Sequence, residues 1–224
     1  MKRHLLLFLI SLLAYPMAAQ EKTQTELAIE SQGFVDLQRV DPSIPVDLMY
    51  SRADNFTGKT LYTDLHHGYL HPQAARALKL AQAELKRLRP DLSLKVYDAA
   101  RPMRIQQRMW NVVAGTSKNI YVSNPRNGGG LHNYGLAVDI TLCEAATGDT
   151  LHMGTKIDYM GKLAHVRAES EMLQKKKLNK EALENRKLLR RVMAAGGFKV
   201  LPTEWWHFNF KSRAEAKAKY KVIK

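Results

Sequence analysis

Cysteine is nearly absent from this sequence: Cys143 is the only one in 224 residues, so the chain has no intramolecular disulfide bond. We interpret Cys143 as a small buried apolar residue rather than a nucleophile. Internal repeats and low-complexity tracts are also missing. The one long apolar run, near the N-terminus, meets Pro16 and then polar residues 20–24 before it reaches the about 20 residues that a membrane-spanning helix needs. Stability must therefore come from a hydrophobic core, to which a bound metal would add.

The N-terminal apolar run has the layout of a secretory signal peptide. Lys2 and Arg3 precede the run and small residues end it, which predicts cleavage after Ala19. The mature protein is then expected to be exported, soluble, and periplasmic or extracellular. We interpret residues 20–33 as a polar lead-in and residues 34–224 as one domain, long enough to bury a substantial core.

The chain is strongly basic. Its formal charge of +14 falls to +12 when Lys2 and Arg3 leave with the signal peptide. Positive residues concentrate in segments 175–191 and 211–224, which are typical of solvated helical faces, and no helix-turn-helix, zinc-finger or RNP-type pattern accompanies them. We therefore expect no nucleic-acid partner, and instead electrostatic contact with anionic cell-wall polymer or lipid head groups.

The apolar periodicity predicts an α+β fold. Leu78, Ala81 and Leu85 recur at helical spacing after Pro72, whereas apolar and polar residues alternate from Leu92 to Val96 as in a half-buried strand. The order of elements lacks the regular alternation of a doubly wound parallel sheet. We therefore expect a single compact domain with a small, mainly antiparallel sheet flanked by helices. The expected helices are residues 72–88, 105–113 and 179–195, and the expected strands are residues 46–50, 92–96, 136–142 and 204–210.

Two histidines stand in unusual surroundings. His132 follows a triple glycine, and seven residues later Asp139 lies inside an apolar strand, where a buried carboxylate needs a positively charged partner. His207 lies among aromatic residues, three positions after Glu204. Catalytic zinc sites use three protein ligands and leave one position open. His132, Asp139 and His207 therefore form a candidate zinc site on the sheet, with Glu204 as a candidate general base.

The spacing alone leaves simpler interpretations open. A lone His132 is more often a loop histidine, and a lone His207 is more often a hydrogen-bonded core residue. Strand alternation also places residues three apart on opposite faces. For Glu204 to act beside His207, it must therefore lie in the turn before the strand, which Pro202 favours.

Several segments, taken in order along nearly the whole mature chain, are similar to the VanX-type D-alanyl-D-alanine dipeptidases, a family of zinc peptidases. The closing Glu-Trp-Trp-His and the Asn-Phe-Thr-Gly loop are the most specific of them. The similar segments are Asp54 to Gly58, Asp98-x-x-Arg101-Pro102, His132-x-x-Gly135-x-Ala137-x-Asp139, Thr147-Gly148-Asp149 through Met153-Gly154, Asp158, and Glu204 to His207.

The resemblance implies one zinc ion per chain, held by His132, Asp139 and His207, with Glu204 as the catalytic base. It also implies that Arg101 stabilises the tetrahedral oxyanion. A guanidinium at a strand exit is always charged, so aiming it at developing negative charge favours the transition state. The alternative for Arg101 is an ordinary structural ion pair with Asp98 in the preceding strand.

The resemblance further implies that Asp158 binds the free amino group of a small D,D-dipeptide. A buried carboxylate left without its cation is costly, so this residue would restrict the enzyme to dipeptides. A helix cap or a surface charge is the alternative for Asp158. One departure from the family stands beside the zinc site: Gly130 occupies the position, two residues before His132, where the family usually has serine.

The predicted function is hydrolysis of D-alanyl-D-alanine to two D-alanine molecules. Resistance-type members of the family act inside the cell, whereas an exported enzyme would take dipeptide released from the wall, in salvage or turnover. Two alternatives stand beside this prediction. One is a D,D-carboxypeptidase acting on peptidoglycan stem peptides, and the other is a basic wall-binding protein whose zinc is only structural.

Overall fold

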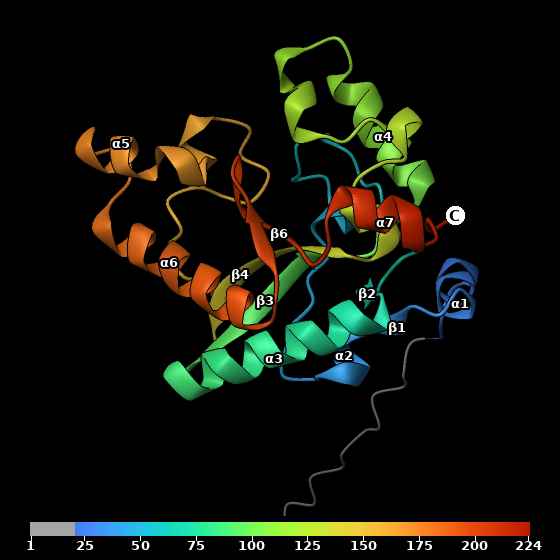
Figure 1. Ribbon diagram of the computed structural model, residues 1–224, viewed down its shortest axis with the longest axis horizontal. Helices are drawn as coiled ribbons and strands as arrows, with labels where there is room; N and C mark the ends of the chain where they lie inside the picture. The colour runs from blue at the N-terminus through green and yellow to red at the C-terminus, as the bar shows by residue number, and fades with distance from the viewer. Residues whose placement is uncertain (1–20) are drawn as a thin grey trace, which may run out of the picture.

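The computed structural model describes residues 21–224, and the predicted signal peptide lies outside these residues. Within them, no helix combines the length and the apolar composition that crossing a bilayer requires. Figure 1 shows α5 and α6 at one end of the molecule and α4, α7 and the C-terminus at the other, with the sheet between them. The helices are α1 (Gln24–Ser31), α2 (Leu37–Val40), α3 (Pro72–Leu88), α4 (Met103–Val113), α5 (Glu169–Gln174), α6 (Lys180–Ala195) and α7 (Arg213–Lys219).

The main sheet has four antiparallel strands in the order β3, β4, β6, β5. A separate pair, β1 and β2, forms a two-stranded antiparallel ribbon. This architecture confirms the predicted α+β domain with a small antiparallel sheet. The strands are β1 (Val35–Asp36), β2 (Tyr69–Leu70), β3 (Leu92–Asp98), β4 (Ala137–Glu144), β5 (Lys199–Leu201) and β6 (Glu204–Asn209).

Strand β4 separates the hydrophobic core from the face that carries polar side chains. Alternate residues of the strand point to opposite faces, and Val138, Ile140 and Leu142 join the core cluster that includes residues of α3 and α6. Asp139 and Thr141 point to the other face, where two pockets open. The apolar stretch that predicted this strand therefore also orients Asp139 away from the core.

The predicted helices are confirmed, with small shifts at their ends. Helix α3 spans the predicted residues, and α4 begins two residues earlier than expected, at Met103. Asn179, the expected first residue of α6, is its N-cap, and its side-chain oxygen accepts a hydrogen bond from the Ala182 N–H at 2.8 Å.

Three sequence-based expectations are corrected. The strand expected at residues 46–50 is wrong: Val46 only bridges the edge of β3, and the chain then turns into a 3-10 helix, η1 (Met49–Ser51), which buries Tyr50. The expected polar lead-in contains α1, which a Thr23–Glu26 capping box begins and which buries Ile29. Finally, Arg186 is buried, although its segment was expected to be a solvated helical face.

Candidate active site

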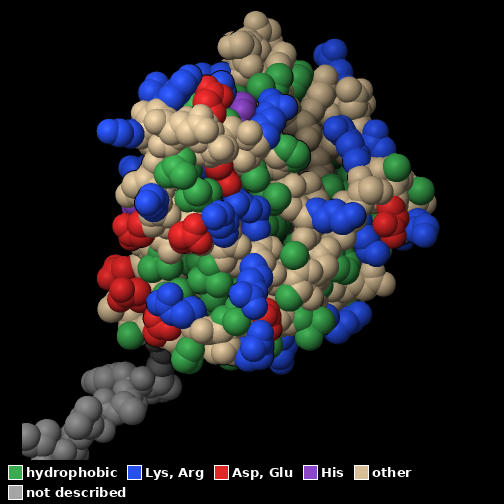
Figure 2. All heavy atoms as spheres, turned by 60° about the vertical axis from the view of Figure 1, so that its left-hand side comes forward, with side chains coloured by type: hydrophobic (Ala, Val, Ile, Leu, Met, Phe, Trp, Pro, Cys, Tyr) green, Lys and Arg blue, Asp and Glu red, His purple; other side chains and the backbone are tan. Residues whose placement is uncertain are grey.

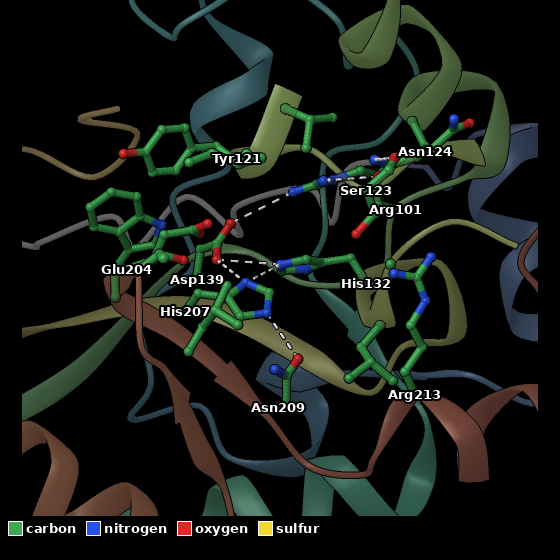
Figure 3. Close-up of a pocket in the computed structure, with 18 of the residues that line it drawn as sticks. Arg101, Tyr121, Ser123, Asn124, His132, Asp139, Glu204, His207, Asn209 and Arg213 are labelled. Carbon is green, nitrogen blue, oxygen red and sulfur yellow. Dashed lines mark hydrogen bonds and ion pairs between the residues drawn. The ribbon is translucent and has the colours of Figure 1, made fainter. Parts of the chain in front are cut away.

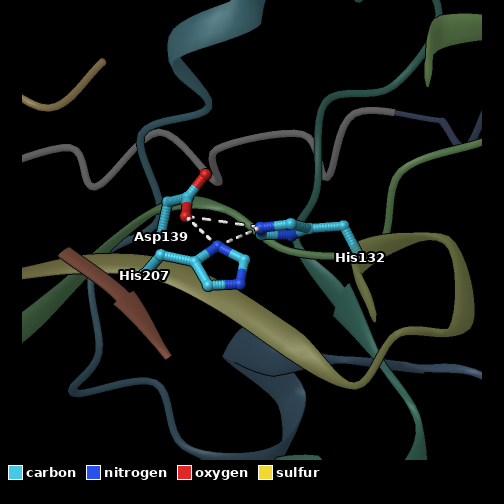
Figure 4. A group of neighbouring side chains, drawn as sticks. All are labelled: His132, Asp139 and His207. Atoms are coloured by element: carbon cyan, nitrogen blue, oxygen red, sulfur yellow. Dashed lines mark hydrogen bonds and ion pairs between the residues drawn. The ribbon is translucent and has the colours of Figure 1, made fainter. Parts of the chain in front are cut away.

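Three elements bring the predicted metal ligands together. Asp139 on β4 and His207 on β6 are direct cross-strand partners, and His132 lies in the 3-10 helix η4 (Leu131–Tyr134) just before β4. His207 Nδ1 lies 2.9 Å from Asp139 Oδ1, and His132 Nε2 lies 3.3 Å from the same oxygen. The two ring nitrogens are 3.2 Å apart. Figure 4 shows these three atoms converging on one point.

The imidazole rings of His132 and His207 each have one nitrogen facing the cluster and one facing outward, and the outward nitrogens have hydrogen-bond partners. His132 Nδ1 lies 2.7 Å from the Ala99 carbonyl oxygen, and His207 Nε2 lies 2.9 Å from Asn209 Oδ1. The Ala99 carbonyl oxygen and Asn209 Oδ1 both accept hydrogen bonds, so a proton on each outer nitrogen satisfies these contacts. The inner nitrogens then present lone pairs to each other and to the Asp139 carboxylate. Such a cluster of electron-pair donors fits a bound cation, and outer partners of this kind orient metal-binding histidines.

Asp139 remains ionised in this cluster. Burial alone would raise its pKa, but positive charge on His132 and His207 and hydrogen bonds from their rings, when these are protonated, hold the pKa of this carboxyl below its ordinary value; a bound cation would take the place of that charge. The site thus combines two imidazole nitrogens and one carboxylate oxygen, a donor set that catalytic zinc sites use.

Arg101 lies at the exit of β3, where the sequence predicted it. Its Nε donates to Asp98 Oδ2 at 2.9 Å and its Nη1 donates to Gln106 Oε1 at 3.0 Å. Its Nη2 also reaches to 3.6 Å from Asp139 Oδ2. The ion pair with Asp98 is therefore present, and the guanidinium lines the cleft as well. Because two partners fix it, Arg101 is a preorganised donor beside the candidate metal site.

The backbones of Arg101 and His132 are also tied together. The Arg101 N–H donates to the His132 carbonyl at 3.0 Å, and Asn133 Nδ2 donates to the Arg101 carbonyl at 2.7 Å. This contact holds the strand exit against the 3-10 helix that carries the histidine.

Glu204 is the first residue of β6, and not a turn residue before the strand as expected. The pairing of β5 with β6 shifts between Val200 and Leu201, which leaves extra residues on β6 after Glu204. Such a bulge changes the facing of a strand, and it explains why Glu204 and His207 both line the cleft. Burial raises the pKa of Glu204 to about 8. A carboxyl that titrates near neutral pH suits a proton-transfer role.

Asp158 lies in the long connection between β4 and α5, with a positive φ of 65°. Its Oδ1 accepts a hydrogen bond from the Tyr50 hydroxyl at 2.9 Å, and its Oδ2 accepts one from the Phe56 N–H at 3.5 Å. Burial, together with the Asp139 charge, raises the pKa of Asp158 to about 7. Neither a helix cap nor an exposed surface position describes this residue, because its carboxyl faces the cleft.

All six predicted site residues line one cleft of about 980 Å³. Figure 3 shows Glu204 on one side of the triad and Ser123, Asn124 and Arg213 on the other. Sequence reasoning missed Tyr50, Gln106 and Asn209, which hold site residues in place. Tyr50 reaches Asp158 only through the tertiary fold, whereas Gln106 and Asn209 contact Arg101 and His207, which lie five and two residues away in the sequence. None of the three belongs to a recognisable motif.

Two imidazole nitrogens and a carboxylate oxygen that could hold a cation, beside a carboxyl of raised pKa and a fixed guanidinium, form the arrangement of a metal-dependent hydrolase. The comparisons with known proteins agree with this class. The family described as D-ala-D-ala dipeptidase matches residues 30–224, and the chain belongs to that peptidase family. The family membership confirms the resemblance stated from the sequence motifs.

Individual relatives cover most of the chain. A D-alanyl-D-alanine dipeptidase of Escherichia coli strain K12 is 33% identical over 182 residues, which is 80% of this chain and 86% of the relative. One from Streptomyces coelicolor is 30% identical over 74% of this chain and 85% of the relative. One from Enterococcus faecium is 26% identical over 79% and 90%.

Proposed function

We propose that this protein hydrolyses D-alanyl-D-alanine to two D-alanine molecules, with one zinc ion held by His132, Asp139 and His207. The observation that carries the proposal is the convergence of three possible metal-ligand atoms in a cleft that also contains Glu204. The family and the relatives support the substrate. The nitrogen and oxygen donor set supports zinc as the metal.

A bound zinc ion would supply Lewis-acid polarisation of the peptide carbonyl and a lowered pKa for the attacking water. Glu204 accepts the proton of that water and then delivers it to the leaving amino group. Its pKa of about 8 lets the same carboxyl hold and release a proton near neutral pH. The Arg101 guanidinium donates hydrogen bonds to the oxyanion as negative charge develops there, and its Asp98 and Gln106 contacts keep it in position.

Asp158 receives the free ammonium group of the substrate. The positively charged ammonium would replace a proton on this carboxylate and would offset the negative charges of Asp158 and Asp139. A longer peptide has an amide in place of the ammonium, so it would leave Asp158 charged and unpaired. This geometry supports a dipeptidase over a D,D-carboxypeptidase.

Export and a role in wall salvage or turnover form the second part of the proposal. The N-terminal signal-peptide pattern and the basic composition support it. Figure 2 shows Lys and Arg side chains spread over much of one face. Such a face favours electrostatic contact with anionic wall polymer or lipid head groups, and this contact would weaken as salt is added.

The test incubates the purified protein with free D-alanyl-D-alanine and, separately, with a stem pentapeptide ending in the same two residues. We expect turnover of the dipeptide alone, with about one zinc ion per chain by elemental analysis. Cleavage of the pentapeptide but not the dipeptide would make the protein a carboxypeptidase. Zinc content without any turnover would make it a binding protein with a structural metal.

A further inference from the structure

The substrate of the proposed function carries two charges, and the site as described accounts for one of them. In the proposed function Asp158 receives the ammonium, and Arg101 donates to the scissile carbonyl oxygen beside the candidate metal site. The terminal carboxylate must then lie on the far side of the triad, away from Glu204 and Asp158. Figure 3 shows that Ser123, Asn124 and Arg213 occupy this side of the cleft.

Ser123 takes the place of a side chain that position 130 lacks. Gly130 is the N-cap of η4, two residues before His132, and its φ of −107° is open to any residue. A Cβ atom built on Gly130 would lie 2.9 Å from Ser123 Oγ and 3.2 Å from Ser123 Cβ. The hydroxyl of Ser123, from a segment before η4 in the chain, therefore fills the space beside His132 that a residue-130 side chain would fill.

The position of Ser123 is fixed relative to Arg101. The Ser123 carbonyl accepts a hydrogen bond from Gln106 Nε2 at 2.7 Å, and Gln106 Oε1 accepts one from Arg101 Nη1. Gln106 is fully buried, so it acts as a rigid spacer between the two residues. Within residues 21–224 the Ser123 hydroxyl has no hydrogen-bond partner, which leaves it available to a ligand.

Arg213 supplies a positive charge at the same place. It begins α7, and its Nη2 donates to the carbonyls of Asn127 at 3.2 Å and Gly129 at 2.8 Å, just before Gly130. In the described part of the chain no acidic residue pairs with it, whereas Lys211 pairs with Glu215. The guanidinium is thus held against the glycine loop with its charge uncompensated.

We propose that the Ser123 hydroxyl and the Arg213 guanidinium form the subsite for the terminal carboxylate of the substrate. This assignment rests on the proposed dipeptidase function. Together with Asp158, this subsite would let the cleft bind both charged ends of the zwitterionic dipeptide. The enzyme would then select a dipeptide by its carboxylate as well as by its ammonium group.

The test compares D-alanyl-D-alanine with D-alanyl-D-alaninamide, which lacks the carboxylate charge. We expect kcat/KM of the zinc-loaded wild type to fall about 10-fold to 100-fold on the amide. Ser123→Gly and Arg213→Gln should each lower kcat/KM about tenfold on the dipeptide and leave the amide rate unchanged. Arg126→Gln removes a charge from the same loop outside the cleft and should preserve the wild-type preference.

A swap variant tests whether the hydroxyl acts through its place in the cleft. Ser123→Gly combined with Gly130→Ser moves the hydroxyl to the other segment without the clash, and it should recover most of the dipeptide activity that Ser123→Gly loses. The amide rate reports on folding in every variant. Equal loss on both substrates in Arg213→Gln, or no recovery in the swap, would overturn the subsite. Failure of the wild type on the dipeptide would instead overturn the proposed function.

Discussion

Replacing Glu204 by glutamine separates a proton-transfer role from a structural one. In the folded, metal-free protein Glu204 releases its proton at a pKa of about 8, whereas its ordinary value is 4.5. Between these values the folded state holds a proton that the unfolded chain has lost, so stability falls as the pH rises. At about 1.4 kcal/mol per pH unit, the wild type loses up to about 5 kcal/mol by the time the pH exceeds 8.

Glutamine has nearly the same shape as glutamate and does not ionise, so the free energy of unfolding of Glu204→Gln should not fall in this way as the pH rises. Metal-free Glu204→Gln should match wild type at about pH 4 and should unfold at a Tm about 10 °C higher above about pH 8. The zinc-loaded variant should keep its metal and lose about 10²-fold to 10⁴-fold in kcat, the usual contribution of a general base.

The assay is thermal unfolding of metal-free protein across this pH range, followed by zinc analysis and dipeptide hydrolysis. Glu144→Gln at the exposed end of β4 is the matched control, since the same change there lies outside the cleft. Equal Tm values for wild type and Glu204→Gln at high pH would refute the buried-charge reasoning. Loss of zinc in Glu204→Gln would make Glu204 a ligand rather than a base.

Three further predictions concern the metal, the Asp158 carboxylate and the fold. Dialysis against a chelator should abolish hydrolysis and lower Tm, and added zinc should restore both, because the metal binds only the folded state. In wild type kcat/KM should fall as the pH drops below about 7, where Asp158 takes up a proton, and Asp158→Asn should have a kcat/KM about 10²-fold lower than wild type above this pH. Arg186→Met should lower the free energy of unfolding by about 1–3 kcal/mol in denaturant titration, because it leaves the buried Met153 and Leu163 carbonyls without a donor, whereas Glu169 keeps its contacts with Arg190.

Local patterns predicted the elements whose own residues decide their structure. The Leu78, Ala81 and Leu85 spacing specifies α3, and the apolar stretch around Asp139 specifies β4. The capping signal at Thr23 was equally local, and its helix was missed because the segment is polar on average. The sequence therefore contained more helix information than its hydropathy suggested.

The contacts that complete the site are decided by tertiary structure. Asp158 accepts a hydrogen bond from the hydroxyl of Tyr50, which lies 108 residues away in the sequence. No local sequence pattern near either residue predicts this contact. The shift in pairing between β5 and β6, which turns Glu204 into the cleft, depends on how the two strands meet. The motifs thus predicted residues that the fold gathers in one cleft, whereas only the fold showed how Glu204 and His207 both line it.

The register of the main sheet explains why so few residues build the centre of the site. Asp139 on β4 pairs with Asp98 on one side and with His207 on the other. One row across three strands therefore contains the partner of Arg101, the carboxylate of the candidate metal site and one of its imidazoles. Because side chains alternate along a strand, a slip of one residue would send Asp139 into the hydrophobic core and Val138 or Ile140 into the cleft. Burial of the apolar residues of β4 against α3 and α6 thus also fixes the position of the charged ones, and the stability of the sheet and the geometry of the site depend on the same register.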